Sequence, residues 1–123
     1  MSADIRQFND ARYINLETFK KNGKSVFTPV WFVIENSFIF VVTRAVTGKV
    51  KRVRNNPNVR IVPSGFRGEP KGTWIGGIAE ILNPADSTRI MHLRNRKYGL
   101  QAKLASLLTM RKGKYVVLSI KVI

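Results

Sequence analysis

The chain is dominated by short runs of β-branched and aromatic residues separated by turn residues, a pattern typical of β-strands. The two densest runs cover residues 26–34 and 38–43, with Glu35-Asn36-Ser37 between them as a turn. Further strands are predicted at 12–19, 59–63, 74–82 and 115–122. Six short strands leave exposed edges unless the sheet closes on itself, so we expect a mainly β fold, an antiparallel β-barrel with helices.

Three features refine the strand pattern. Asn22-Gly23 predicts a hairpin between the first two strands, because both central turn positions favour positive φ. Pro29 removes a backbone donor, which restricts it to a sheet edge, a bulge or a strand end. The pair Gly76-Gly77 inside the strand at 74–82 predicts a bulge or a close approach of another group to the backbone.

Helical patterns occupy the segments between the strands. A short helix or arm is predicted at 4–10, a helix at 83–98 with Asn83 or Asp86 as its cap, and an amphipathic helix at 100–110. Between the strands at 38–43 and 59–63, a basic helix is expected to start at Thr47 and to stop before Pro57.

The start of this basic helix is the strongest candidate binding site in the sequence. Val46, Val50 and Val53 form one apolar stripe that can dock on the sheet, which leaves the lysines and arginines to other faces. Thr47-Gly48-Lys49 combines the unpaired N–H donors of a helix N-terminus with a lysine. Such a site suits an anion, phosphate above all.

Composition and charge agree with an anionic partner. The 123 residues suit a single domain over 1–123, and the 22 Lys and Arg against 7 Asp and Glu give a net charge of +15. Nucleic acid, an acidic membrane surface or a multiply anionic small molecule would each match this charge. The polar first ten residues and the lack of a membrane-length apolar run predict a cytoplasmic protein that does not associate with membranes.

No motif for side-chain catalysis is present. The chain has no cysteine, a single histidine (His92) and seven scattered acidic residues, so neither a catalytic triad nor a metal cluster is predicted. Gly23-Lys24-Ser25 lacks the earlier glycine of a phosphate-binding loop. We therefore predict no metal site, and the catalytic residues stay unknown.

Two classes of anion binder compete. A nucleic-acid module would use Trp31, Phe32, Phe38 and Phe40 as stacking platforms on a basic barrel. A redox cofactor-binding protein needs few catalytic side chains, because the cofactor brings its own chemistry. The aromatic residues lie in runs too continuously apolar to be mainly surface, so we favour the cofactor and do not expect nucleic acid as the partner.

The run TPVWFVIENSFIFVVTRAVTGKVKRVRNNPNVRI resembles the flavin-binding split-barrel proteins related to pyridoxamine 5′-phosphate oxidase. The resemblance covers about residues 13–82 and is most similar to the short branch that uses the deazaflavin coenzyme F420. Its most specific part is Thr43, Thr47-x-Lys49 and Asn56-Pro57-x-Val59. It implies a six-stranded antiparallel Greek-key split barrel that forms a homodimer with the cofactor, F420 or FMN, at the interface.

The resemblance also implies site residues. Thr43, Thr47 and Lys49 would hold the phosphate. Gly48 stands where the oxidase has arginine, so one phosphate contact would be either missing or replaced by Arg44 or Lys51. Trp74 would close the site from the partner chain. The strand that lies along the cofactor ring through its backbone comprises Phe27, Thr28, Pro29, Val30 and Trp31.

The expected activity is hydride transfer between this cofactor and a small organic substrate. The carboxylate-rich tail of F420 suits the charge of +15, and the candidates to bind it are Lys20, Lys21, Arg44, Lys51, Arg52 and Arg54. The oxidase itself carries a C-terminal substrate-binding segment not found before Ile123, so oxidation of pyridoxamine phosphate is not expected. A cofactor-binding protein without catalysis is the alternative.

Overall fold

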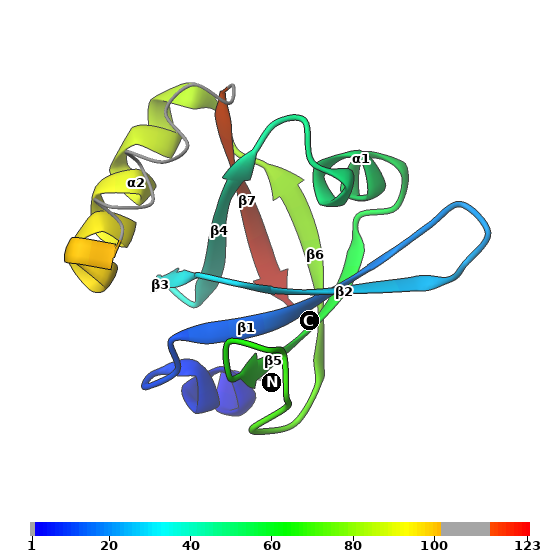
Figure 1. Ribbon diagram of the computed structural model, residues 1–123, viewed down its shortest axis with the longest axis horizontal. Coiled ribbons are helices and arrows are strands. Elements are labelled where there is room, and N and C mark those ends of the chain that lie inside the picture. The colour runs from blue at the N-terminus through cyan, green and yellow to red at the C-terminus, as the bar shows by residue number, and fades with distance from the viewer. Residues whose placement is uncertain (1, 102–113) are drawn as a thin grey trace.

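A computed structural model describes residues 2–101 and 114–123 of the chain, and within these residues one antiparallel sheet curls into a barrel-like shape (Figure 1). Its strand order is β2-β1-β5-β6-β7-β4-β3. The strands are β1 (Tyr13–Phe19), β2 (Ser25–Val30), β3 (Val33–Glu35), β4 (Phe38–Arg44), β5 (Asn58–Ser64), β6 (Ile75–Ile81) and β7 (Tyr115–Val122). The helices are the 3₁₀-helix η1 (Ser2–Phe8), α1 (Gly48–Asn55) and α2 (Pro84–Tyr98).

The sheet has seven strands instead of the six predicted, because the run at 26–34 divides at Trp31-Phe32. β2 pairs with β1 at one edge of the sheet, and β3 pairs with β4 at the other. One continuous stretch of chain therefore serves both edges, and it changes partners where the curled sheet comes round on itself. Pro29 lies on the edge strand β2, where its missing N–H deprives no central strand of a bond, as predicted.

The main core fills the inside of the curl. Its fully buried side chains include Ile14 of β1, Ile61 of β5 and Leu118 of β7. Helix α1 adds Val53 at one end of β1, and η1 adds Phe8 before its other end, where the Phe8 ring meets that of Phe32 edge to face. The two short helices thus cover opposite ends of the barrel interior.

A second apolar cluster lies between α2 and the outer side of β3, β4 and β7 (Figure 1). Its buried members are Val33, Phe40, Ile90 and Val117. Because both faces of these strands are covered, residues 38–42 read as a nearly continuous apolar run instead of an alternating one. The burial of Phe32 and Phe40 also removes two of the four aromatic rings considered as stacking platforms.

The capping, turn and glycine signals in the sequence are largely confirmed by the structure. Asn83 occupies the N-cap of α2, and its side chain accepts a hydrogen bond from Asp86 N–H, while Gly99 with φ 52° terminates the helix. The hairpin between β1 and β2 forms, but only Gly23 of its turn has positive φ. A Cβ on Gly77 would lie 2.7 Å from Ile120 Cγ2, which confirms the close approach predicted there.

Two of the predicted helical segments are only partly matched by the described structure. Val46 is not part of the apolar stripe of α1, because the helix begins at Gly48 and leaves Val46 81% exposed; Val50 and Val53 alone are buried. The helix predicted at 100–110 lies outside the described residues except for its first two positions.

Tyr98, the last residue of α2, holds the junction between β2 and β3. Its hydroxyl accepts a hydrogen bond from Phe32 N–H at 3.0 Å and lies 2.7 Å from the Arg12 carbonyl oxygen. Its ring stacks on Trp31 with 4.4 Å between centroids and 9° between planes. Burial raises the pKa of the Tyr98 phenol to about 12. The neutral hydroxyl therefore forms hydrogen bonds with backbone groups that have no partner in the interrupted β-ladder.

We expect Tyr98→Phe to destabilise the fold by about 1–3 kcal/mol, because it leaves the buried Phe32 N–H without its partner. Urea unfolding followed by circular dichroism measures the change. Tyr13→Phe is the matched control, since no hydrogen bond of the Tyr13 hydroxyl is found within the described residues. Equal stability of Tyr98→Phe and wild type would contradict this role of the hydroxyl.

Candidate functional site

The residues predicted to bind phosphate meet where β4 runs into α1. Thr43, near the end of β4, is 7% exposed, and its hydroxyl lies 3.4 Å from that of Thr47. Thr47 occupies the N-cap of α1, as predicted, but its hydroxyl donates to the Arg44 carbonyl at 3.0 Å and makes no capping bond. The first-turn N–H donors of α1 thus receive no acceptor from the cap side chain.

Three cationic side chains surround this helix start. Lys49 is half-buried beside Arg44 and Arg52, and both guanidinium groups act on it electrostatically. Arg52 lies over Gly48: a Cβ at position 48 would be 2.6 Å from Arg52 Nη1. The place where the oxidase carries an arginine is therefore filled by a guanidinium from one helical turn later. The resemblance implied Arg44 or Lys51 for this contact; in the structure Arg52 is an additional cation next to Gly48, and Arg44 lies beside Lys49 as well.

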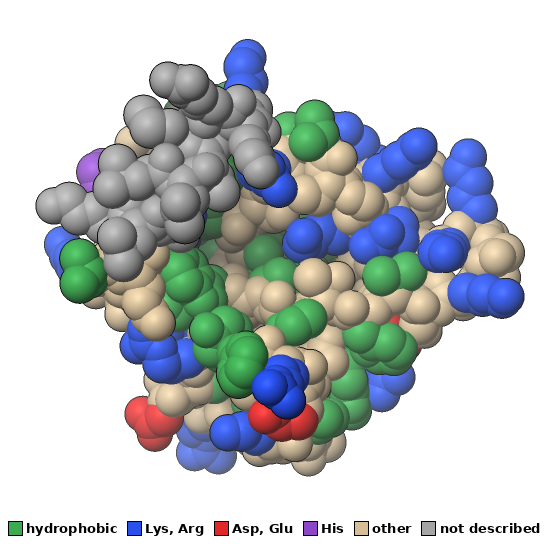
Figure 2. Space-filling model, viewed as in Figure 1, with side chains coloured by type: hydrophobic (Ala, Val, Ile, Leu, Met, Phe, Trp, Pro, Cys, Tyr) green, Lys and Arg blue, Asp and Glu red, His purple; other side chains and the backbone are tan. Residues whose placement is uncertain are grey.

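The positive charge of this cluster is not balanced by neighbouring carboxylates. The ion pairs found within the described residues join Arg60 to Glu17 at 3.1 Å and Arg89 to Glu35, so neither includes a cation of this cluster. Burial, and then the charges of Arg52 and Arg44, lower the pKa of Lys49. A cluster that disfavours its own charged form in the free protein gains free energy when an anion arrives. Figure 2 shows lysines and arginines gathered over α1 and the β1–β2 hairpin.

Arg52 also ties this cluster to the strands. Its Nε donates to Thr18 Oγ1 at 2.7 Å, and Thr18 is opposite Val26 of β2 in the sheet. Thr18 is only 1% exposed although it is polar, and the sequence analysis did not predict that it contacts this cluster. The one sequence signal was its position in the apolar alternation of β1, where an inward hydroxyl needs a partner.

The predicted ring strand lies on an open edge of the sheet. Side chains of β2 alternate between exposed and half-buried, and Phe27 is 52% exposed. Phe27 contacts Trp74 edge to face at 5.6 Å within the same chain, and the Arg60 guanidinium lies 5.2 Å from the Trp74 ring centre. Half of the backbone groups of an edge strand face no other strand, so β2 can offer hydrogen bonds to a flat ligand.

The structure thus assembles the predicted residues into two groups. Thr43, Arg44, Thr47, Gly48 and Lys49 converge at the start of α1, with Lys51 exposed on the same helix. Residues 27–31 and Trp74 form the second group along β2. Neither group lines the four cavities described for this part of the chain. One cavity of about 320 Å³ adjoins α1 and is lined by Phe19, Lys20, Lys21, Asn55 and Asn56.

Solved structures share this architecture across almost the entire chain. The heme storage protein HutZ from Vibrio cholerae superposes with a TM-score of 0.74 at 14% identity over 98% of this chain and 89% of its own. A conserved hypothetical protein, Rv2991 from Mycobacterium tuberculosis, gives 0.76 at 22% identity, covering 99% and 80%. A putative pyridoxamine 5′-phosphate oxidase from Listeria innocua gives 0.68 at 14% identity, covering 96% and 89%.

The chain therefore has the split-barrel fold found in pyridoxamine 5′-phosphate oxidase-like proteins, which confirms the resemblance at the level of fold. No protein-family model and no curated protein sequence matches it. Among the described residues, no helix is long and apolar enough to cross a membrane, and no group of three or more potential metal ligands occurs.

The charge cluster predicts a trade-off at Lys49. In a buffer without multivalent anions, Lys49→Met should raise the melting temperature, because it removes a half-buried charge that two arginines disfavour. Since the pKa of Lys49 is lowered in the fold, the cost is present at neutral pH and fades as pH approaches 10.5; the gain should fade with it.

Lys51→Met, which changes an exposed lysine of the same helix, is the control and should leave the melting temperature nearly unchanged. Both variants are measured by calorimetry at low ionic strength. A melting temperature of Lys49→Met below that of wild type at neutral pH would show that the charge is already balanced in the free protein.

Proposed function

We propose that the protein binds a flavin-type cofactor, coenzyme F420 or FMN, and transfers hydride between it and a small organic substrate. The observation that carries the proposal is the unbalanced cluster of Lys49, Arg44 and Arg52 around the start of α1. Desolvated cations without carboxylate partners are the arrangement expected for a bound phosphate.

The residues at this cluster fit a phosphate group. The Thr43 and Thr47 hydroxyls and the first-turn N–H groups of α1 supply neutral donors, and Lys49 and Arg52 supply charge. Gly48 leaves room for the guanidinium of Arg52, so the missing arginine at position 48 costs the site no cation. The hydrogen bond to Thr18 holds the Arg52 guanidinium in place, so Arg52 loses less entropy when it contacts an anion.

The ring of the cofactor is assigned to the edge strand β2. Its free backbone groups can bond polar ring atoms, while Phe27 and Trp74 provide an adjacent aromatic surface. A bound flavin or deazaflavin supplies the hydride chemistry itself. The protein side chains then need only orient the ring and exclude water, in agreement with a chain whose sequence contains no triad or metal motif.

The proposal extends to a homodimer with the cofactor at its interface. Phe27 and Phe66 are 52% and 63% exposed, which leaves aromatic surface near β2 that a second copy could cover. The β2 side of the site is exposed at Phe27 in the single chain, and a partner would supply the missing wall there. The alternative is a protein that binds the cofactor without catalysing a reaction on it.

Fluorescence titration with FMN and with F420, beside hemin and a single-stranded DNA, tests the proposed cofactor. Tight binding of FMN or F420, with DNA bound weakly and lost in salt, is expected. Binding of hemin alone would move the function towards that of the neighbour HutZ, a heme storage protein. Binding of DNA alone would reject the cofactor proposal.

Lys49→Ala should weaken binding of FMN and F420 by about tenfold or more, because it removes a charge-assisted contact to the phosphate. Lys71→Ala, which removes an exposed lysine remote from α1, is the control. The affinities come from the same fluorescence titration. Unchanged affinity of Lys49→Ala would exclude the start of α1 as the phosphate site.

The double variant Lys20→Ala/Lys21→Ala discriminates between the two cofactors. These lysines line the 320 Å³ cavity beside the end of α1, where the carboxylate tail of F420 would extend beyond the phosphate. We expect a loss of F420 affinity of about tenfold with FMN affinity nearly unchanged. An equal loss for both cofactors would remove the hairpin lysines from the tail site.

A further inference from the structure

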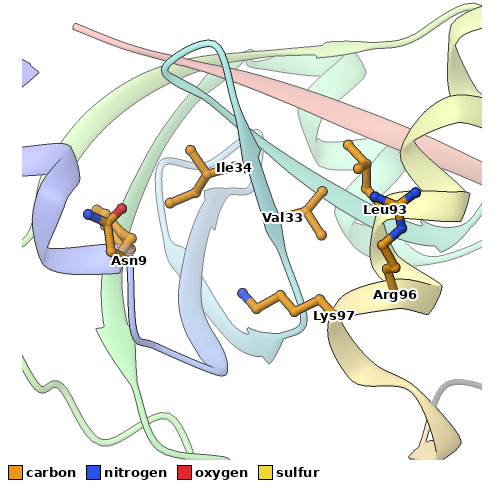
Figure 3. A pocket seen from close by; sticks show the side chains of 7 residues that line it. Asn9, Val33, Ile34, Leu93, Arg96 and Lys97 are labelled. Carbon is orange, nitrogen blue, oxygen red and sulfur yellow. The ribbon is translucent and has the colours of Figure 1, made fainter.

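A cavity of about 450 Å³ lies between η1, β3 and α2, next to the β2–β3 junction. Figure 3 shows Val33 and Ile34 of β3 above it, Leu93 and Arg96 on the α2 side, and the amine end of Lys97 turned towards the side where Asn9 lies. The cavity is separate from the residues assigned to the cofactor. None of Thr43, Lys49, Phe27 or Trp74 lines it.

The lining is chemically asymmetric. Phe8, Val33, Ile34 and Leu93 give it an apolar wall, whereas Arg96 and Lys97 give it two cations; none of the described residues that line it is acidic. The nearest carboxylate on β3, Glu35, pairs with Arg89 of α2. An apolar wall beside uncompensated positive charge complements a ligand with an apolar body and one anionic group.

The Lys97 side chain is held in position by contacts with Phe32. Its Nζ donates to the Phe32 carbonyl at 2.9 Å and lies 3.5 Å from the centre of the Phe32 ring. A lysine ammonium has three N–H donors, so this single bond leaves two for a ligand. The bond to a buried backbone carbonyl fixes the position of the charge, and a fixed charge loses less entropy when it binds an anion.

From this geometry we infer that the cavity between η1, β3 and α2 binds a small organic carboxylate with an apolar body, anchored by Lys97 and Arg96. The size of about 450 Å³ suits a ligand of one aromatic ring with a short acid chain. This inference does not depend on the proposed cofactor, because no residue of the α1 cluster takes part.

The state of the Lys97 amine supports the assignment. Burial, and then the charge of Arg12, lower its pKa to about 8. The charged and titratable groups around it are Arg12 before β1, Arg96 and Tyr98 on α2, and Glu35 held by Arg89. Carboxylate affinity should therefore fall as pH rises from 7 to 9, and carboxylate binding should raise the pKa of Lys97.

The test is a titration of the cofactor-free protein with 4-phenylbutyrate, with 4-phenyl-1-butanol as the uncharged match, followed by NMR shifts. Shifts centred on Ile34, Leu93 and Lys97, and an affinity for the acid about tenfold above that for the alcohol, are expected. Shifts elsewhere, or equal affinities for acid and alcohol, would overturn the inference.

Variants separate charge from fold. Lys97→Met should weaken binding of the acid about tenfold and leave that of the alcohol unchanged. Because Lys97 also bonds Phe32, Arg96→Met provides a second variant at an exposed position and should weaken binding of the acid severalfold. Arg67→Met is the remote control. If Arg96→Met and a folded Lys97→Met both bind the acid like wild type, the anchoring role is rejected.

Discussion

The structure depends on one constraint: a single stretch of chain, residues 25–35, must serve as both edges of the sheet. β2 pairs with β1 and β3 pairs with β4, so the backbone between them has no strand partner at Trp31-Phe32. Buried backbone groups without partners are costly, and Tyr98 and Lys97 from α2 bond the N–H and carbonyl of Phe32. Helix α2 therefore does more than cover an apolar face. It completes the hydrogen bonding where the barrel is split.

A second tension concerns charge. Burial, and then the neighbouring cations at the start of α1, lower the pKa of Lys49, an arrangement that works against stability in the free protein. Such arrangements persist at binding sites because the ligand, and not the fold, relieves the repulsion. The Arg52–Thr18 hydrogen bond fits this interpretation. It uses a buried hydroxyl to orient a guanidinium group that already has like-charged neighbours.

Structural features that depend on residues close together in the sequence were predicted, whereas features that depend on distant residues were not. Strand positions, the Asn83 cap and the edge location of Pro29 rest on local residue preferences and were predicted. The split of the run at 26–34 was not, because periodicity within one strand carries no information on which strand lies beside it. The prediction that Val46 belongs to the apolar stripe of α1 was wrong for a related reason. Its spacing fitted the stripe, but the helix starts two residues later.

The site divides in the same way. Thr43, Thr47 and Lys49 are close in sequence, so a motif could place them together. Arg52 over Gly48 required the actual turn of the helix, and Thr18 required the packing of α1 against β1, 34 residues away. The Lys97–Phe32 contact joins residues 65 apart, and no single-sequence pattern reports it.

The junction at Trp31-Phe32 lies between the two proposed sites. Trp31 directly follows β2, the strand assigned to the cofactor ring, and stacks on Tyr98, while the carbonyl of Phe32 holds the Lys97 amine beside the second cavity. A ligand that draws Lys97 towards a carboxylate acts on the same backbone segment that borders β2. Coupling between sites requires a shared element that both ligands bias, and this segment is short, includes the buried Phe32 and is hydrogen-bonded to α2. A carboxylate in the second cavity and a ring on β2 would thus meet through two residues of one chain.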